Sequence, residues 1–163
     1  MNNKNCYLKS ICHHRSMDTD TINYSDEYIK EILSETKTVA VVGASSKPDR
    51  DSYKVIESLL AHGYKVFPVN PNEIDNSILG LSFYPDLNSI KHSVDMVDVF
   101  RSSDAVMGVT QEAIQINAKV VWMQLEIINY EAANLAEIAG LKVIMNRCPK
   151  IEFKKLNWTR KTN

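Results

Sequence analysis

The residues best suited to chemistry form a turn of small side chains followed closely by two cations. The apolar stretch Thr38–Val42 leads into residues 43–46, and Lys47 and Arg50 come directly afterwards. Where a strand turns into a helix, free backbone N–H groups and the positive end of the helix dipole can bind phosphate. The pattern G-x-S-x-x-P between Gly43 and Pro48 differs from the three glycines of a dinucleotide fingerprint. It predicts a phosphate-binding loop that is not a standard NAD loop; the alternative is an ordinary strand–turn–helix corner.

The elements around this turn alternate between apolar strands and amphipathic helices. Strands are expected at 38–42, 64–69, 94–100, 119–123 and 141–145, with a further short strand near Gly80 to Phe83. Helices are expected after the caps Ser25, Ser102 or Ser103, and Asn129, and from Asp51 to His62. Alternation of this kind predicts an α/β fold, a three-layer, doubly wound and mostly parallel sheet.

Length and composition restrict the class of protein. The chain has 163 residues, 44% of them apolar and 24% charged, with a net charge of −1, which fits one globular domain. The balanced charge gives no general attraction to nucleic acid or to an acidic membrane, and no apolar run approaches the roughly 18 residues of a membrane span. Cys6, Cys12 and Cys148 are an odd number without framework spacing, which predicts a reducing compartment, the cytoplasm.

The two ends of the chain differ in character from its middle. Residues 1–23 are polar without apolar periodicity and predict a flexible extension, and residues 154–163 form a basic tail. Cys6, Cys12, His13 and His14 could ligate a metal, but neither a fourth ordered ligand nor zinc-site spacing is visible. We therefore expect no metal site.

The carboxyl ends of the predicted strands lack the groups of two common enzyme classes. An NAD site needs an acidic residue after the second strand, where this chain has Asn70 between prolines. His62 and His92 fall at the opposite edge of the sheet, so no catalytic triad is expected. Cys148 lies on the carboxyl edge, and its two interpretations are a buried core cysteine, which is favoured, and a thiol near a ligand.

Cations and apolar groups are what the carboxyl edge does offer. Lys47, Arg50 and Arg101, with Arg147 as a further candidate, could hold several phosphates. Phe100 and the prolines at 68 and 71 could line a slot for a base. The edge therefore predicts a phosphorylated ligand that contains adenine.

These stretches together resemble a known family. Residues 24–153 are similar to the stand-alone CoA-binding proteins, and to the CoA-binding domain of succinyl-CoA synthetase and of NDP-forming acyl-CoA synthetases. The resemblance rests on matching stretches at 42–52, 63–71, Tyr84 with Leu87, 94–101, 118–125 and 139–150. It implies a Rossmann-like domain that binds CoA or an acyl-CoA. By the family pattern, Gly43, Ala44 and Ser45 hold the diphosphate, and Arg50 pairs with phosphate. Val69, Asn70 and Pro71 flank the adenosine, and Phe100, Arg101, Gln124 and Leu125 line the rest of the site.

The chain departs from the family pattern at two positions. Glu126 stands where the family usually has glycine, and Gly108 replaces a larger residue in a helix. The phosphohistidine loop of the synthetases belongs to a domain outside the matched stretches. The resemblance therefore implies a non-catalytic carrier, sensor or regulatory module with a small-molecule CoA ligand. The alternatives are an NAD(P)-dependent oxidoreductase, the CoA-binding half of a two-chain acyl-CoA synthetase, or a dimerising protein whose site has decayed. Homodimers are common among such domains.

Overall fold

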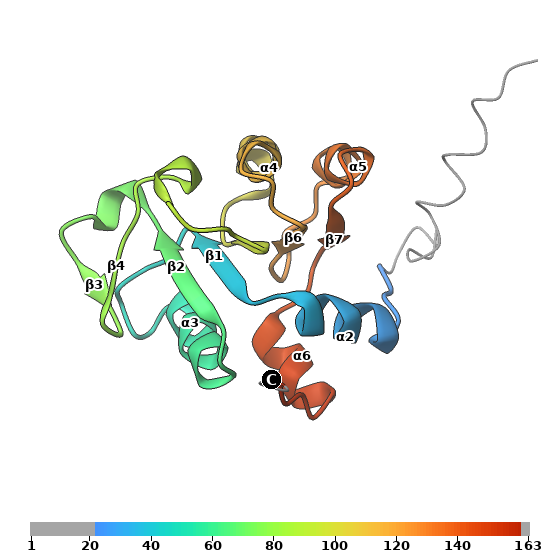
Figure 1. The fold of residues 1–163 in the computed structure, drawn as a ribbon, viewed down its shortest axis with the longest axis horizontal. Helices are drawn as coiled ribbons and strands as arrows, with labels where there is room; N and C mark the ends of the chain where they lie inside the picture. The colour runs from blue at the N-terminus through green and yellow to red at the C-terminus, as the bar shows by residue number, and fades with distance from the viewer. Residues whose placement is uncertain (1–21, 161–163) are drawn as a thin grey trace, which may run out of the picture.

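A five-stranded parallel sheet forms the centre of the molecule. The computed structural model describes residues 22–160. The strands lie in the order β2-β1-β5-β6-β7 (Figure 1). Their bounds are β1 Thr38–Val42, β2 Lys65–Val69, β5 Met96–Val99, β6 Val120–Met123 and β7 Lys142–Ile144. Every neighbouring pair is parallel, which confirms the predicted α/β class.

Helices cover both faces of the sheet and make it a three-layer structure. Figure 1 shows α4 (Val106–Gln115) and α5 (Tyr130–Ile138) on one face. On the other face lie α2 (Asp26–Glu35), α3 (Asp51–Ala61) and α6 (Pro149–Lys155). Alternate residues of β1 enter separate cores: Val39 and Val41 pack with the α2–α3 side, and Ala40 and Val42 with the other. A strand covered on both faces has no polar side, as its sequence predicted.

The order of the strands reverses next to β1, which places a ligand-binding crevice there. From β1 the chain passes outward to β2, and it then crosses to β5 on the other side of β1. In doubly wound sheets ligands bind at the carboxyl ends of the strands on either side of such a reversal. The crevice here lies between the segments that follow β1 and β5, which begin at Gly43 and Phe100.

Two of the three predicted helix caps are confirmed. The Tyr28 amide donates to Ser25 Oγ at the start of α2 (3.1 Å), and the Ala132 amide donates to Asn129 Oδ1 at the start of α5 (2.9 Å). The predicted cap at Ser102 or Ser103 is confirmed only in position, since Ser102 precedes the helical segment but makes no capping hydrogen bond through its side chain. A 3-10 turn, η4 (Ser103–Ala105), precedes α4, and no side chain caps either element. Ser103 is instead engaged with the α5 segment, where its Oγ accepts from the Ile128 amide (3.4 Å).

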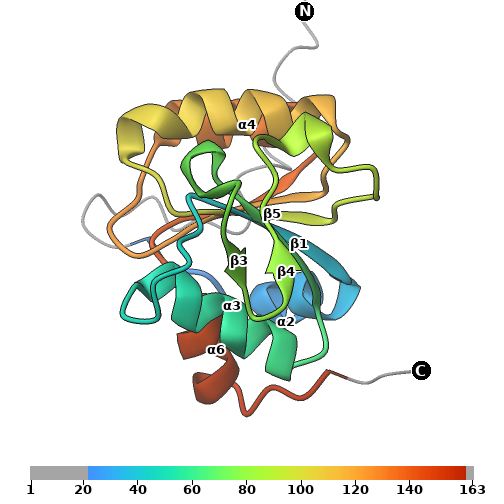
Figure 2. The same ribbon diagram turned by 90° about the vertical axis from the view of Figure 1, so that its left-hand side faces the viewer.

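The predicted short strand near Gly80 belongs to a separate hairpin. Strands β3 (Ser77–Ile78) and β4 (Leu81–Ser82) pair antiparallel with each other and form a separate two-stranded sheet. Figure 2 shows this hairpin in front of the main sheet. The segment returns to the sheet through one parallel bridge between Val69 and Tyr84. Two 3-10 turns flank the hairpin, η2 (Pro71–Glu73) and η3 (Leu87–Ser89).

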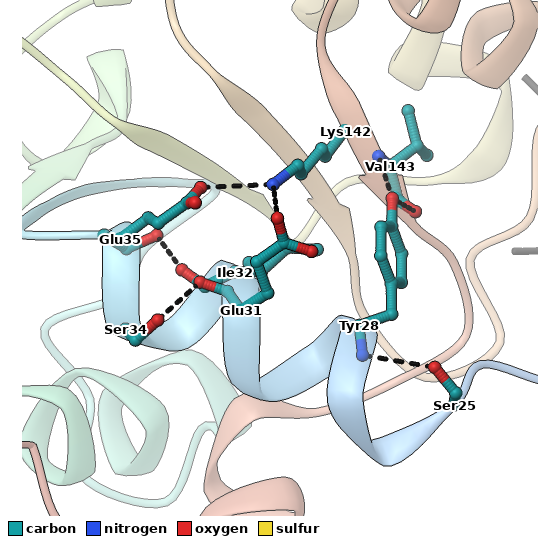
Figure 3. Close-up of polar contacts among 9 residues, drawn as sticks. Ser25, Tyr28, Glu31, Ile32, Ser34, Glu35, Lys142 and Val143 are labelled. Atoms are coloured by element: carbon teal, nitrogen blue, oxygen red, sulfur yellow. Dashed lines mark hydrogen bonds and ion pairs between the residues drawn. The ribbon is translucent and has the colours of Figure 1, made fainter. Parts of the chain in front are cut away.

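The outer edge of β7 is closed by tyrosines from the start of the described chain. The Tyr28 hydroxyl accepts from the Val143 amide (3.2 Å) and donates to the Val143 carbonyl (3.3 Å), and Tyr24 Oη accepts from the Met145 amide (2.9 Å). Lys142 pairs with Glu31 and Glu35 of α2 (Figure 3). These contacts satisfy backbone groups that would otherwise form an open sheet edge.

The last described residues pack back onto the domain. The predicted boundary after Phe153 falls inside α6. Beyond it, Trp158 Nε1 donates to Tyr64 Oη (3.1 Å), and the Arg160 guanidinium lies 5.0 Å from the centre of the Tyr64 ring. The predicted extension, with Cys6, Cys12, His13 and His14, lies outside the described residues apart from Ile22 and Asn23. Within 22–160 there is no helix with the length and apolar character to span a bilayer, and no cluster of potential metal ligands.

Candidate functional site

Two adjoining cavities open at the carboxyl edge of the sheet, on either side of Phe100. The smaller has a volume of about 380 Å³ and the larger about 510 Å³, and Asp51 and Phe100 line both. The smaller is otherwise lined by Gly43, Ser45, Lys47, Arg50, Ser52 and Glu73. The larger is otherwise lined by Lys54, Val55, Arg101, Ser102, Gln124, Leu125, Glu126, Ile127, Cys148, Lys150 and Ile151. An elongated ligand could therefore extend from one cavity into the other.

Gly43 allows the segments after β1 and β5 to approach closely. Its φ is +88°, a left-handed conformation that glycine adopts without strain. A Cβ atom built at this position would lie 2.3 Å from the Phe100 carbonyl oxygen and 3.2 Å from Arg101 Cδ. The wall between the cavities thus depends on the absence of a side chain at residue 43.

The backbone amides of the 43–47 turn are already engaged within the protein. The Gly43 and Ala44 amides donate to the Val69 carbonyl (2.9 and 3.3 Å). The Ser45 amide donates to Ser52 Oγ (3.1 Å), and the Lys47 amide donates to Ser45 Oγ (3.3 Å). The Ser46 amide donates to Glu73 Oε1 (3.4 Å). In this conformation the turn offers no unoccupied backbone donor from residue 43 to residue 47.

Helix α3 supplies the backbone donors that the turn does not. The first amides of a helix have no partner within it, and no side chain caps the start of α3 at Arg50. Asp51 and Ser52, its first two residues, line the smaller cavity. The partial positive charge of the helix terminus adds to the nearby Lys47 and Arg50 side chains. The anion-binding part of the site therefore lies at this helix terminus, beside the turn.

Glu73 is a wall residue that the sequence reasoning missed. Its carboxylate accepts from Ser46 Oγ (2.7 Å) and from Asn76 Nδ2 (2.8 Å), as well as from the Ser46 amide. These hydrogen bonds, with Lys47 nearby, lower the pKa of Glu73, so the carboxylate is ionised at neutral pH. The only feature of the sequence that could have indicated Glu73 as a site residue was its position in the turn shortly after β2. Asp51, Ser52, Lys54 and Lys150 were also missed, although the start of α3 could have indicated the first two.

A buried carboxyl group lies behind the larger cavity. Asp98 of β5 is fully buried, and its Oδ1 accepts from Gln124 Nε2 at 2.6 Å. Burial raises the pKa of Asp98 to about 7, which the hydrogen bond from Gln124 only partly offsets. One Nε2 hydrogen is used in this way, which leaves the second Nε2 hydrogen and the amide oxygen of Gln124 for a ligand. The wall can therefore both donate to and accept from a group such as an amide.

Glu126 adopts a backbone conformation that explains why glycine suits this position. Its φ is +66°, and its amide donates to Asn146 Oδ1 at 2.8 Å. The side chain is exposed and lines the larger cavity. Glycine would remove both the backbone strain and the negative charge. The other departure, Gly108 in α4, is exposed, and a Cβ there would meet no atom within 4 Å.

Cys148 lines the larger cavity as a poorly reactive thiol. It is 8% exposed, and burial raises its pKa above the usual value. A thiol in that state carries little thiolate at neutral pH, so it acts as a wall of the cavity rather than as a nucleophile. The neighbouring Arg147 lines neither cavity, since its guanidinium donates to the Ile22 and Asn146 carbonyls (2.6 and 2.8 Å).

Eight of the twelve predicted site residues line the two cavities, and the other four line neither. Ala44 is fully buried, and its carbonyl accepts from Asn70 Nδ2 (2.8 Å). Val69 is buried and holds the Gly43 and Ala44 amides, whereas Pro71 is exposed at the start of η2. These residues join the end of β2 to the turn. The eight are Gly43, Ser45, Lys47, Arg50, Phe100, Arg101, Gln124 and Leu125.

Known proteins similar to this chain share the same domain. Residues 37–154 match the protein family described as "CoA binding domain". The uncharacterized protein YneT of Bacillus subtilis is 40% identical over 129 residues, which cover 79% of this chain and 94% of YneT. The alpha subunit of ADP-forming acetate–CoA ligase I of Pyrococcus furiosus is 36% identical over 95 residues, 56% of this chain and 21% of that subunit. A hypothetical protein of Pyrococcus horikoshii OT3 superposes with a TM-score of 0.79 at 41% identity, covering 83% of this chain and 94% of the other.

Proposed function

Because the chain belongs to the CoA binding domain family, we propose that it binds coenzyme A or an acyl-CoA in the two cavities beside Phe100. One observation carries the proposal: a helix terminus with uncapped amides beside Lys47 and Arg50 adjoins a larger, less polar cavity at the reversal of strand order. Coenzyme A has matching parts, a nucleotide diphosphate joined to a long pantetheine arm. Doubly wound sheets bind nucleotides at this place.

The phosphates would be bound mainly by side chains and by the start of α3. Lys47 and Arg50 line the smaller cavity next to the amides of the first turn of α3. Charge-assisted hydrogen bonds from such groups are about twice as strong as neutral ones. The turn at Gly43 would shape the cavity and let the diphosphate approach. The backbone amides of this turn already donate to acceptors within the protein, so they would not bind the diphosphate.

The pantetheine arm would occupy the larger cavity. Its amide groups need both donors and acceptors, and the Gln124 amide oxygen is a fixed acceptor in that wall. The thiol or thioester end would reach the region of Cys148 and Ile151. We propose a carrying, sensing or regulatory role. Cys148 is buried and its pKa is raised, so we propose no covalent step at this thiol.

A second candidate is the CoA-binding half of a two-chain acyl-CoA synthetase. Its support is the 36% identity to the alpha subunit of acetate–CoA ligase I, of which this chain matches 21%. Such a role would use the same CoA site and would need a partner chain to carry out the ligation. For either role we propose a cytoplasmic location, which the three cysteines without framework spacing favour.

Thermal unfolding in the presence of candidate ligands tests the proposal. A ligand at 100 times its Kd adds about 2.7 kcal/mol to stability, which for a domain of this size raises Tm by roughly 5–10 °C. We expect such a shift with CoA or acetyl-CoA and a smaller one with NAD, NADP or ATP. A larger shift with NAD than with CoA would favour a dinucleotide site instead.

A further inference from the structure

The position of Glu73 bears on which nucleotides the site accepts. It lies four residues after the end of β2, in η2. Dinucleotide-binding sheets place an acidic residue near this point to accept hydrogen bonds from the ribose hydroxyls. The second strand ends here in Asn70, and the structure brings a carboxylate to the same cavity from the following turn. Glu73 and the start of α3 line the same cavity, so Glu73 is within reach of a ribose whose phosphates lie at the start of α3.

The Glu73 carboxylate is held in place. Ser46 contributes two donors and Asn76 a third, so turning the carboxylate away would break three hydrogen bonds. Its charge also cancels part of the cationic character of the smaller cavity. The charged side chains in that wall are Lys47 and Arg50 against Asp51 and Glu73, so their formal charges sum to zero. The cavity therefore has no surplus positive charge for an additional phosphate.

We propose that Glu73 is a specificity-determining residue that disfavours a phosphate group on the ribose and favours a free ribose hydroxyl. The inference rests on the proposed CoA site and makes it more specific. Coenzyme A carries a 3′-phosphate on its adenosine ribose, and dephospho-CoA carries a hydroxyl there. The hydroxyl can donate to the Glu73 carboxylate, whereas the phosphate dianion is repelled by it.

Isothermal titration with CoA and dephospho-CoA tests the inference. The quantity to compare is the ratio of the two Kd values in the wild-type protein and in Glu73→Gln, which keeps the size of the side chain. We expect Glu73→Gln to change this ratio by about tenfold in favour of CoA. The substitution removes the repulsion between Glu73 and the 3′-phosphate of CoA, and it removes the charged acceptor for the hydroxyl of dephospho-CoA. Ser46→Ala, which removes one anchor of the carboxylate, should shift the ratio in the same direction by a smaller factor.

Glu57→Gln is the matched control. Glu57 is exposed on α3 and lines neither cavity, so its substitution changes the net charge equally without changing the site. A ratio that stays within about twofold in Glu73→Gln, or that shifts equally in Glu57→Gln, overturns the role of Glu73. Those results would leave CoA binding itself intact. Failure of both ligands to bind the wild-type protein would instead overturn the proposed function together with the inference.

Discussion

Gly43 lies so close to Phe100 that no other residue fits at position 43 without movement. The Phe100 amide donates to the Val42 carbonyl (2.8 Å), which aligns the two segments directly after β1 and β5. The position of a Gly43 Cβ is 2.3 Å from the Phe100 carbonyl oxygen. This contact forms the wall between the two cavities. Glycine is therefore required at position 43 because the backbones after β1 and β5 pack closely there.

Gly43→Ala should destabilise the protein by about 3 kcal/mol or more, because it combines left-handed strain with a backbone clash. Gly63→Ala is the control, since Gly63 has a φ of +80° and a Cβ added there would meet no atom within 4 Å. It should cost only about 1–2 kcal/mol. Urea unfolding of both variants measures the difference, and equal losses would show that the Phe100 contact is unimportant.

Glu126→Gly should stabilise the protein by about 1 kcal/mol because it relieves the strain at a φ of +66°. Glu126→Gln keeps the side chain and the strain, so its stability should stay within about 0.5 kcal/mol of wild type. Both should tighten CoA binding, since each removes a negative charge from the larger cavity. Chemical unfolding and CoA titration of the pair separate the two effects. Equal stabilisation by both substitutions would assign the effect to charge.

Much of the fold could be predicted because its signals are local. Apolar runs identified the strands of the main sheet. Ser25 and Asn129 were identified as helix caps because each has a side-chain oxygen and directly precedes an amphipathic stretch. The cap predicted at Ser102 or Ser103 has no side-chain hydrogen bond, and the Ser103 hydroxyl accepts instead from the Ile128 amide, which is distant in the sequence. The two-residue strands of the hairpin are too short to show a period.

The walls of the site could be predicted less completely, because they depend on contacts between separate loops. The carboxyl-edge rule indicated Lys47, Arg50 and Arg101, and the structure places the first two on the wall of the smaller cavity and Arg101 on the wall of the larger one. It could not show that the 43–47 amides are satisfied by Val69, Ser52 and other internal acceptors, or that Glu73 reaches the same cavity. An acidic residue in a turn after a strand, such as Glu73, belongs to no apolar period, so the sequence pattern does not indicate its position.

Asp98→Asn should remove a pH-dependent loss of stability. The pKa of Asp98 is about 7 in the folded protein, above the value of about 3.9 expected when unfolded. The folded state therefore binds the proton more tightly, and stability falls as pH rises from about 4 through 7. The variant should match wild type near pH 4 and exceed it near pH 8 by about 1–3 kcal/mol. Denaturant titrations at both pH values measure this, and a pH-independent difference would contradict it.

Arg50→Ala should weaken CoA binding by about 1–3 kcal/mol, the range for a hydrogen bond to a charged group. Lys91→Ala is the control because Lys91 is exposed, lies before β5 at the other edge of the sheet and lines neither cavity. The loss at Arg50 should shrink as salt is added, since ions screen partly exposed pairs. Titration calorimetry at two salt concentrations checks both points. Equal affinity of Arg50→Ala and Lys91→Ala would remove Arg50 from the site.

The most direct measurement is a calorimetric titration of the wild-type protein with coenzyme A, repeated with NAD. Saturation should occur at one CoA per chain. CoA should bind more tightly than NAD, because its pantetheine arm can occupy the larger cavity. No binding of CoA or acetyl-CoA at millimolar concentration, or tighter binding of NAD than of CoA, would contradict a CoA site beside Phe100.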